Sequence, residues 1–335
     1  MGVIAAGSDT ATSSVLAIDA GNSKTDLAFV GVDGSVLATA RVGGFQPPTT
    51  GIDAALDMLG TAVEGALADA RSRGAAIGEV EHVSACLANA DLPVEERELT
   101  EAILSRGWAR TAEVRNDTFA VLRAGVDEPL GVAVVCGAGI NCVGMLPDGR
   151  TARFPAIGKI SGDWGGGGGL SDEAMWHAAR AEDGRGEPTE LARTLPRHFG
   201  LDSMYALIEA FHLGRIPVER RHEMAPVLFA TSIAGDPVAR SLVRRQAEEV
   251  VAMSTVALEK LGLLDERVPV LLGGGVLAAR HPELDEQIVA LLAAKAPKAV
   301  IRVVTAPPVL GAALLGLDRL GAPAAARAKL RAYYI

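Results

Sequence analysis

The chain has 335 residues, of which 49% are hydrophobic and 4% aromatic, and its formal net charge is -9. This acidic balance argues against a nucleic-acid-binding protein, which needs a basic face, and no apolar run is long enough to cross a membrane. The length predicts two domains, each with its own hydrophobic core. Residues 1–13 lack a signal-peptide pattern and are expected to be a flexible tail, so we expect a cytoplasmic protein.

The first predicted elements are three strands joined by tight turns. Residues 15–18 form an apolar run that ends at Asp19, a second run follows at 26–32, and Asp33-Gly34 predicts a hairpin turn into a third strand at 35–40. The turn after Asp19 is rich in small hydrogen-bonding residues that can hold a phosphate group. The alternative is a polar hairpin turn without a ligand. The predicted phosphate-binding residues are Asp19, Gly21, Asn22, Ser23, Lys24 and Thr25.

Helices and strands then alternate up to a candidate catalytic acid. Residues 52–73 and 93–106 have the apolar spacing of helices, whereas 80–87 and 111–115 are typical of strands. Asp117 follows the last of these strands and opens the next helix. An Asp in this position commonly caps a helix, and a carboxylate there could also accept a proton.

Two further glycine turns follow buried strands. The apolar strand 130–136 ends at Gly137-Ala138-Gly139, and a partner strand follows at 140–146. The strand 268–272 ends at Gly273-Gly274-Gly275, which precedes a helix. Three glycine turns, each at the end of a buried strand, are what two lobes that hold a nucleotide would need.

The predicted boundary between two lobes lies at Asp117. An N-terminal α/β lobe covers residues 14–117, and a larger C-terminal α/β lobe covers 118–335. Helices dominate an insert in the second lobe at 171–262. The last predicted helix, 309–320, is expected to pack back toward the first lobe.

The most unusual local sequence is a run of five glycines at 165–169. Glycine has high backbone entropy, so such a run forms no stable element by itself. The run is either a flexible linker or a loop that closely approaches a ligand. In the second case we expect the loop to lead into a helix capped by Ser171.

The order of these motifs resembles the actin, Hsp70 and sugar-kinase superfold, and within it the N-acetylglucosamine kinase and BadF/BadG/BcrA/BcrD ATPase family. The resemblance runs from about Val15 to Leu320. It implies an α/β fold of the two-lobed, actin-like ATPase (ribonuclease H-like) type, with the nucleotide cleft between the lobes. The matching segments are the turn after Asp19, Arg115-Asn116-Asp117, Gly137-Ala138-Gly139 with Asn141, Gly162-Asp163, Gly273-Gly274-Gly275 and the helix that begins at Pro308.

The resemblance implies an ATP-dependent kinase that phosphorylates a hydroxyl, the 6-OH, of an amino sugar such as N-acetylglucosamine or glucosamine. It places the general base on Asp117 and puts Mg²⁺ near Asp19, held through water. It also implies a homodimer, with ATP bound by the three glycine turns. The residues implied in sugar binding are Gln46, Asn89, Asp91, Asn116, Asp117, Asn141, Gly162 and Asp163.

Departures from the family pattern leave the sugar open. Ala138 and Ile140 replace hydroxyl-bearing residues of the family's second phosphate motif, and Trp164 replaces a glutamate. Because a site that pairs sugar hydroxyls discriminates strongly through them, such changes are able to alter the substrate.

Two other functional classes stay open. One is a BadF-type ATPase that couples ATP hydrolysis to a partner reductase through a cysteine-ligated cluster. The other is a non-catalytic sugar sensor, which the presence of Asp19 and Asp117 disfavours. The first class is disfavoured because the cysteines lie in apolar strands without metal-ligand spacing. These cysteines are Cys86, Cys136 and Cys142.

Overall fold

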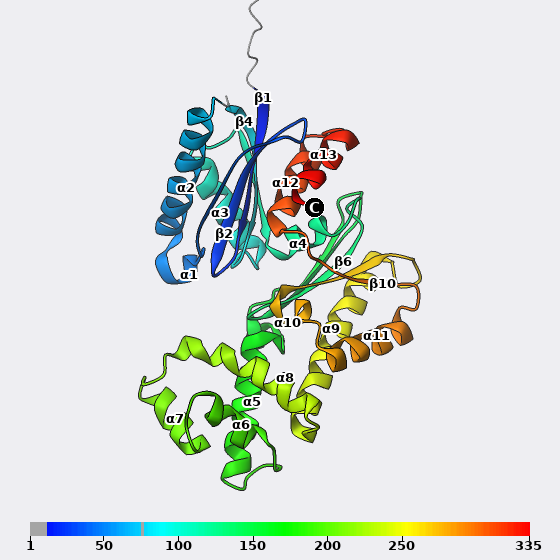
Figure 1. Cartoon of the computed structure of the whole chain (residues 1–335). Coiled ribbons are helices and arrows are strands. Elements are labelled where there is room, and N and C mark those ends of the chain that lie inside the picture. Colours follow the sequence, from blue (N-terminus) through cyan, green and yellow to red (C-terminus); the bar gives the residue numbers. More distant parts are fainter. Residues whose placement is uncertain (1–11, 75–76) are drawn as a thin grey trace, which may run out of the picture. The chain divides into compact units, whose positions relative to one another are not determined.

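The structure is a computed structural model that describes residues 12–74 and 77–335. These residues form two compact units (Figure 1). The first unit holds the described residues up to Pro129 together with Ala306–Ile335, and the second holds Leu130–Thr305. Of the expected N-terminal tail, residues 1–11 lie outside the described part, and Thr12 already begins a strand.

A five-stranded sheet organises the first unit, in the order β3-β2-β1-β4-β5. The first three strands are antiparallel neighbours, and the last two run parallel to β1. The carboxyl ends of β1, β4 and β5 therefore lie at the same edge of the sheet. The strands are β1 (Thr12–Ala20), β2 (Lys24–Gly31), β3 (Val36–Gly43), β4 (Ile77–Leu87) and β5 (Thr111–Asn116).

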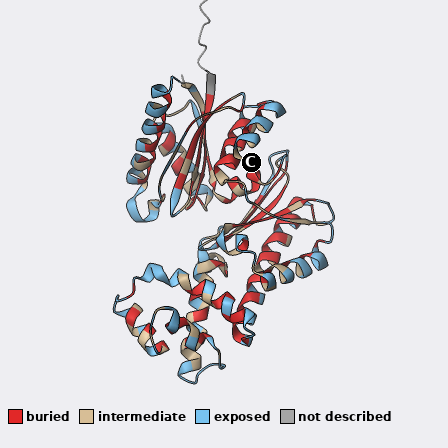
Figure 2. Ribbon diagram, in the orientation of Figure 1, coloured by how far each residue is buried: buried red, intermediate tan, exposed pale blue. Residues whose placement is uncertain are grey.

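Helices cover both faces of this sheet. Side chains alternate along β1, so Leu16 and Ile18 enter the core beneath α2 and α3, whereas Val15 and Ala17 enter the core beneath α12. Figure 2 shows the buried residues along the strands between these helices. The helices are α1 (Pro47–Thr50), α2 (Ile52–Ser72), α3 (Pro93–Ser105), α4 (Thr118–Ala124), α12 (Pro308–Arg319) and α13 (Ala324–Tyr334).

The expected domain boundary at Asp117 lies inside the first unit, because α4 packs against α12. A Cβ built on Gly311 would lie 1.8 Å from the carbonyl oxygen of Ala120, so only glycine permits this approach of the two helices. Arg123 of α4 is fully buried, and its Nε donates to Asp318 at 2.6 Å. These contacts keep the segment after Asp117 in the first unit. The sequence did not predict α13.

The second unit contains another five-stranded sheet, in the order β10-β9-β6-β7-β8. Here too an antiparallel meander is joined by parallel strands. The strands are β6 (Gly131–Cys136), β7 (Ile140–Met145), β8 (Thr151–Arg153), β9 (Pro269–Gly273) and β10 (Val300–Val303).

The helices of the second unit share one hydrophobic core with its sheet. The predicted helical insert is present, although its first helix begins at Gly166 rather than at Ser171. Within the described residues, no helix has the length and apolar character needed to cross a membrane. The helices are η1 (Gly158–Ser161), α5 (Gly166–Glu182), α6 (Leu191–His198), α7 (Met204–His212), η2 (Val218–Glu223), α8 (Met224–Ile233), α9 (Pro237–Leu261), α10 (Gly274–Ala278) and α11 (Pro282–Lys295).

Candidate active site

Acidic side chains gather at the carboxyl edge of the first unit's sheet. Asp19 lies near the end of β1, and Asp26 is its partner across the β1–β2 hairpin. The pKa of Asp19 is raised to about 8, mainly by burial and then by the charges of Asp117 and Asp26, whereas Lys24 opposes the shift. A carboxylate in this position favours either a proton or a nearby cation.

Asp117 occupies the N-cap position of α4, but its side chain accepts no capping hydrogen bond. The backbone amide of Thr118 donates instead to Oδ1 of Asn116, at 2.9 Å. Burial raises the pKa of Asp117 to about 6 and outweighs the hydrogen bonds that lower it. The carboxylate is therefore ionised at neutral pH and is not used for capping, so it is able to accept a proton.

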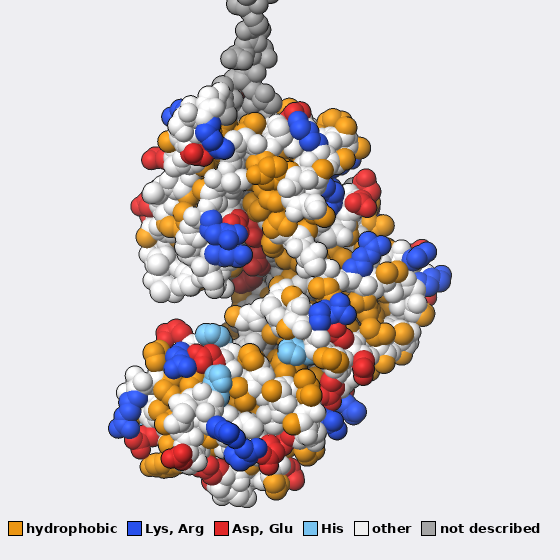
Figure 3. Space-filling view, in the orientation of Figure 1, with side chains coloured by type: hydrophobic (Ala, Val, Ile, Leu, Met, Phe, Trp, Pro, Cys, Tyr) orange, Lys and Arg blue, Asp and Glu red, His pale blue; other side chains and the backbone are white. Residues whose placement is uncertain are grey.

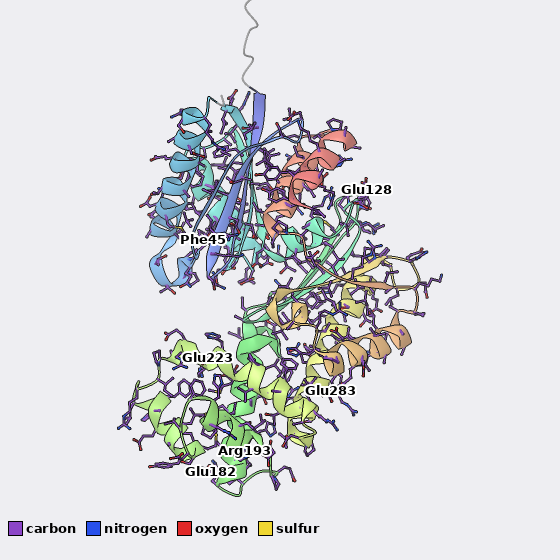
Figure 4. The ribbon with its side chains drawn as sticks, in the orientation of Figure 1. Phe45, Glu128, Glu182, Arg193, Glu223 and Glu283 are labelled. Carbon is purple, nitrogen blue, oxygen red and sulfur yellow. The ribbon has the colours of Figure 1, made fainter. Side chains whose placement is uncertain are left out.

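The first glycine turn is linked to two of the predicted sugar-binding residues. Gln46 Nε2 donates to the carbonyl oxygen of Asn22 at 2.7 Å, and Asn89 Nδ2 donates to Oδ1 of Asn22 at 2.9 Å. Asn89 adopts φ 63, a left-handed conformation that Asn tolerates better than most residues. Phe45, labelled in Figure 4, is fully buried, and its amide donates to Gly21 at 2.9 Å, which anchors the loop that carries Gln46.

Asp91 and Asn116 form a second linked pair. Asn116 Nδ2 donates to Oδ1 of Asp91 at 2.7 Å. Because Asn116 also accepts the amide at the start of α4, Asp91 helps to orient the segment that carries Asp117. The structure thus brings together positions that lie far apart in the sequence.

The remaining residues of the first turn differ in their accessibility. Asn22, Ser23 and Lys24 are exposed, and Lys24 Nζ lies 3.9 Å from Asp26. Thr25 is fully buried, and its hydroxyl has no hydrogen-bond partner among the described residues. Lys24 is therefore open to a ligand, whereas Thr25 lies inside the hairpin.

In the second unit, the glycine run packs against the second glycine turn. The amides of Gly167 and Gly168 donate to the carbonyl oxygens of Gly137 and Ala138, both at 2.8 Å. A Cβ built on Gly166 would lie 2.4 Å from the carbonyl oxygen of Gly139, so a larger residue does not fit. The run is therefore not a flexible linker. It forms the first turn of α5, and the expected helix start at Ser171 is wrong because the turn's carbonyl groups stabilise the glycine backbone.

A hollow of about 400 Å³ in the second unit brings this turn together with Asp163. Oδ2 of Asp163 accepts hydrogen bonds from the Ser161 hydroxyl at 2.5 Å and from the Gly158 amide at 3.0 Å. Gly162, with φ 87, ends η1 and allows this tight loop. The lining includes Ala138, Gly139, Ile140, Lys159, Asp163 and Trp164.

Asn141 has a local contact of its own. Its Oδ1 accepts a hydrogen bond from the amide of Cys142 at 2.7 Å. It lies in β7 next to the second glycine turn, as the sequence predicts, but it is not among the residues that line the hollow.

The third glycine turn lies beside the second. Gly274 has φ 81, and a Cβ built on it would lie 2.3 Å from the carbonyl oxygen of Cys136. Val135 is the partner of Gly273 across β6 and β9. The two turns therefore follow neighbouring parallel strands at the same edge of the second sheet.

Sequence reasoning missed Gln246 of α9, which is fully buried. Its Oε1 accepts the amide of Gly166 at 2.9 Å, and its Nε2 donates to Sγ of Cys136 at 3.4 Å. The signal in the sequence is a polar residue at a core position of an amphipathic helix, between Val243 and Val250. A buried amide side chain of this kind needs hydrogen-bond partners.

The residues around Asp19 fit Mg²⁺ that arrives with a nucleotide. Within the described residues, no group of three or more His, Cys, Asp or Glu side chains is placed to hold a metal by itself. Mg²⁺ commonly uses one or two carboxylates together with water and substrate phosphates. The carboxylate of Asp19 is repelled by the like charges of Asp117 and Asp26. A bound divalent cation would offset this repulsion.

Comparisons with known proteins show which family this chain belongs to. The sequence pattern of the BadF/BadG/BcrA/BcrD ATPase family matches residues 16–316. The N-acetylmuramic acid/N-acetylglucosamine kinase of Clostridium acetobutylicum is 25% identical over 264 residues, which cover 78% of this chain and 85% of that protein. The N-acetyl-D-glucosamine kinase of Dictyostelium discoideum is 26% identical over 208 residues, which cover 61% of this chain and 65% of that protein, just under two thirds of its length.

The fold itself is shared with a protein of known structure. The crystal structure of a candidate N-acetylglucosamine kinase from Chromobacterium violaceum matches with a TM-score of 0.66 and 23% identity, over 91% of this chain and 99% of that chain. This likeness confirms the predicted α/β fold class of the sugar kinases and actin-like ATPases.

Proposed function

The chain belongs to the BadF/BadG/BcrA/BcrD ATPase family, and we propose that it is an ATP-dependent sugar kinase whose substrate is an amino sugar such as N-acetylglucosamine or glucosamine. Two relatives are named as kinases of N-acetylated amino sugars, which supports the substrate class. The observation that carries the proposal is Asp117, a half-buried carboxylate that is ionised at neutral pH and is not engaged in capping.

Asp117 would act as the general base. The sugar hydroxyl, which we take to be the 6-OH, transfers its proton to the Asp117 carboxylate while its oxygen bonds to the γ-phosphorus of ATP. The bond from the γ-phosphorus to the bridging oxygen breaks, and ADP leaves. A pKa of about 6 leaves Asp117 ionised yet basic enough for this step. Bound Mg²⁺ would neutralise phosphate charge.

Other residues would bind and orient the substrates. The exposed part of the first turn, with Lys24, would hold ATP phosphates, as would the amides of Ala138 and Gly139 in the second turn, where the Gly137 amide donates to the carbonyl oxygen of Gly139. The Gly273-Gly274-Gly275 turn would receive the adenosine. For the sugar, Asp163 has one carboxylate oxygen outside its loop contacts. Asp91 and Asn116, which are hydrogen-bonded to each other, are further candidates for binding the sugar.

The geometry disfavours a reductase-coupled ATPase. All the cysteines of the chain are fully buried, and burial raises the pKa of each thiol. A cluster needs thiolates, so such sites are poor ligands. The cysteines concerned are Cys86, Cys136 and Cys142.

A coupled ADP-release assay on the full chain tests the proposal, with ATP, Mg²⁺ and a panel of hexoses and amino sugars. We expect turnover to require an amino sugar, and NMR of the product to show a phosphate ester at C6. ADP release without sugar would support the ATPase class, and sugar binding without ADP release would support the sensor class. We also propose that the protein is cytoplasmic and forms a homodimer. Light scattering coupled to gel filtration would detect the dimer.

A further inference from the structure

A second hollow lies within the first unit and has no role in the function proposed above. Its volume is about 520 Å³, which is in the range of small-molecule sites. Strands β2 and β3 form one side, and the start of α12 and the end of α13 form the other. The lining residues used below are Asp26, Arg41, Val309, Tyr333 and Tyr334.

Tyr334 brings an unused hydrogen-bond donor to this hollow. Its hydroxyl is buried and has no hydrogen-bond partner among the described residues. Burial, with smaller effects from Tyr333 and Asp26, raises the pKa of Tyr334 to about 12, so the hydroxyl keeps its proton. An unpaired buried hydroxyl costs free energy unless a ligand accepts its hydrogen bond.

Arg41 is the cation of this hollow, and the acid that it pairs with, Asp26, also lines it. Arg41 donates to both oxygens of Asp26, through Nε at 2.6 Å and Nη2 at 3.0 Å, and Lys24 Nζ lies 3.9 Å from the same carboxylate. Asp26 is therefore paired with Arg41, which lines the hollow, and with Lys24, which lies outside its lining. Arg41 has five N–H groups and its side chain is 65% exposed, so donors remain for a ligand. Figure 3 shows basic and acidic side chains beside a hydrophobic area on this face of the first unit.

The start of α12 adds a second electropositive feature. Pro307 is its N-cap residue, no side chain caps the helix, and its first turn carries no acidic residue. Helix N-termini attract anions because their first amides lack partners within the helix. Val309, in this first turn, lines the hollow.

Two aromatic rings supply a surface for an apolar body. The rings of Tyr333 and Tyr334 lie edge to face, with centroids 5.0 Å apart, and Tyr333 is 61% exposed. Rings of this kind pack well against another planar or cyclic group. The hollow therefore combines an aromatic side with groups that favour a negative charge.

We propose that this hollow binds a small cyclic organic anion, a phosphate ester or carboxylate carried on a ring. The anionic group accepts hydrogen bonds from Arg41 and from the hydroxyl of Tyr334, and the ring packs against Tyr333 and Val309. None of the residues that line the hollow is among those proposed to bind ATP or the sugar.

Isothermal titration calorimetry on the full chain tests this site with phenyl phosphate and benzoate as probes. We expect at least one of them to bind. Inorganic phosphate lacks the ring and benzyl alcohol lacks the anionic group, so each should bind roughly tenfold more weakly or not at all. The stronger probe shows whether the site prefers a phosphate ester or a carboxylate. Magnesium and a non-hydrolysable ATP analogue should not displace it.

Two variants locate the binding. Tyr334→Phe removes only the hydroxyl and should lower the affinity for the probe roughly tenfold. Thermal stability should change little, because that hydroxyl has no hydrogen-bond partner among the described residues. Arg41→Gln should weaken it similarly, whereas Arg73→Gln, which removes another exposed and paired arginine of the first unit, should have no effect.

Three results would overturn the proposal. They are the absence of binding by both probes, equal affinity in wild type, Tyr334→Phe and Arg41→Gln, and displacement by the ATP analogue, which would place the anion in the nucleotide site. If Tyr334→Phe unfolds, Arg41→Gln alone decides between these outcomes. None of these readouts depends on kinase activity.

Discussion

Oε1 of Gln246 accepts a hydrogen bond from the amide of Gly166 at 2.9 Å, and this contact ties the middle of α9 to the start of α5. The amide of the next residue, Gly167, donates to the carbonyl oxygen of Gly137, so the glycine turn of the second sheet is held by the same segment. Gln246 therefore positions the turn without touching a substrate itself.

We expect Gln246→Leu to raise the KM for ATP roughly tenfold while changing kcat much less. The variant leaves the Gly166 amide buried without an acceptor, which also costs about 1–3 kcal/mol of stability. Steady-state kinetics and chemical denaturation measure the two effects.

A matched control separates positioning from general loss of stability. Ser254→Ala removes another buried side-chain hydrogen bond of α9, but that bond is made to Val250 within the same helix. It should lower stability without changing the KM for ATP. An equal rise of KM in both variants would contradict the positioning role of Gln246.

Asp117→Asn separates catalysis from structure. Asn keeps the size of the side chain but cannot act as the base, so we expect kcat to fall about 10²- to 10⁴-fold. ATP affinity should change little, and the start of α4 should persist because Asn116 accepts the Thr118 amide. Turnover near the wild-type value, measured by ADP release, would remove Asp117 from the mechanism.

The same variant should alter how stability depends on pH. Burial raises the pKa of Asp117 from its ordinary 3.8 to about 6, so between these values the native state binds more protons than the unfolded state. The contribution of this carboxyl to stability is therefore greatest at low pH and is lost as pH rises through about 6. The loss is on the order of 3 kcal/mol.

Denaturant titrations at pH 4.5 and 7.5 measure this effect. Asp117→Asn lacks the ionising group, so its stability relative to wild type should rise between the two pH values. Asp265→Asn, which changes an exposed aspartate, serves as the control and should follow the wild type. A relative stability of Asp117→Asn that falls with pH would contradict the raised pKa.

Valine at the second glycine turn should block the phosphate without disturbing the fold. A Cβ built on Gly137 or on Gly139 meets no atom within 4 Å, and neither residue has a positive φ. We therefore expect Gly137→Val and Gly139→Val to fold and to lose at least roughly tenfold in ATP affinity, measured by calorimetry.

Substitutions at two other glycines serve as controls for that experiment. Gly65 lies on α2 with open space around it, so Gly65→Val should keep both fold and ATP affinity. Gly274→Val should instead damage the fold, because its Cβ would collide with the backbone of Cys136 at a positive φ. Unchanged ATP affinity in stable Gly137→Val and Gly139→Val proteins would argue against a phosphate site at this turn.

The sequence by itself determined most of the elements and the family. Apolar runs, hairpin turns and three glycine clusters predict the strands of the first sheet and β6, β7 and β9 of the second, because these signals depend on local periodicity and on turn chemistry. They also place Asp19 and Asp117 directly after strands, and strand ends are where sites form in such sheets. The same local signals underlie the family resemblance, which the match over residues 16–316 confirms.

Only the tertiary structure decided how the candidate residues work. The glycine run looks unable to form an element when read alone, yet carbonyl groups of the turn at Gly137 and the side chain of Gln246 hold it as a helix start. Asp117 reads as a helix cap, yet Asn116 takes that role. The boundary moves past Asp117 because α12 returns to pack on α4. Each outcome depends on contacts between segments distant in the chain, which local periodicity does not encode.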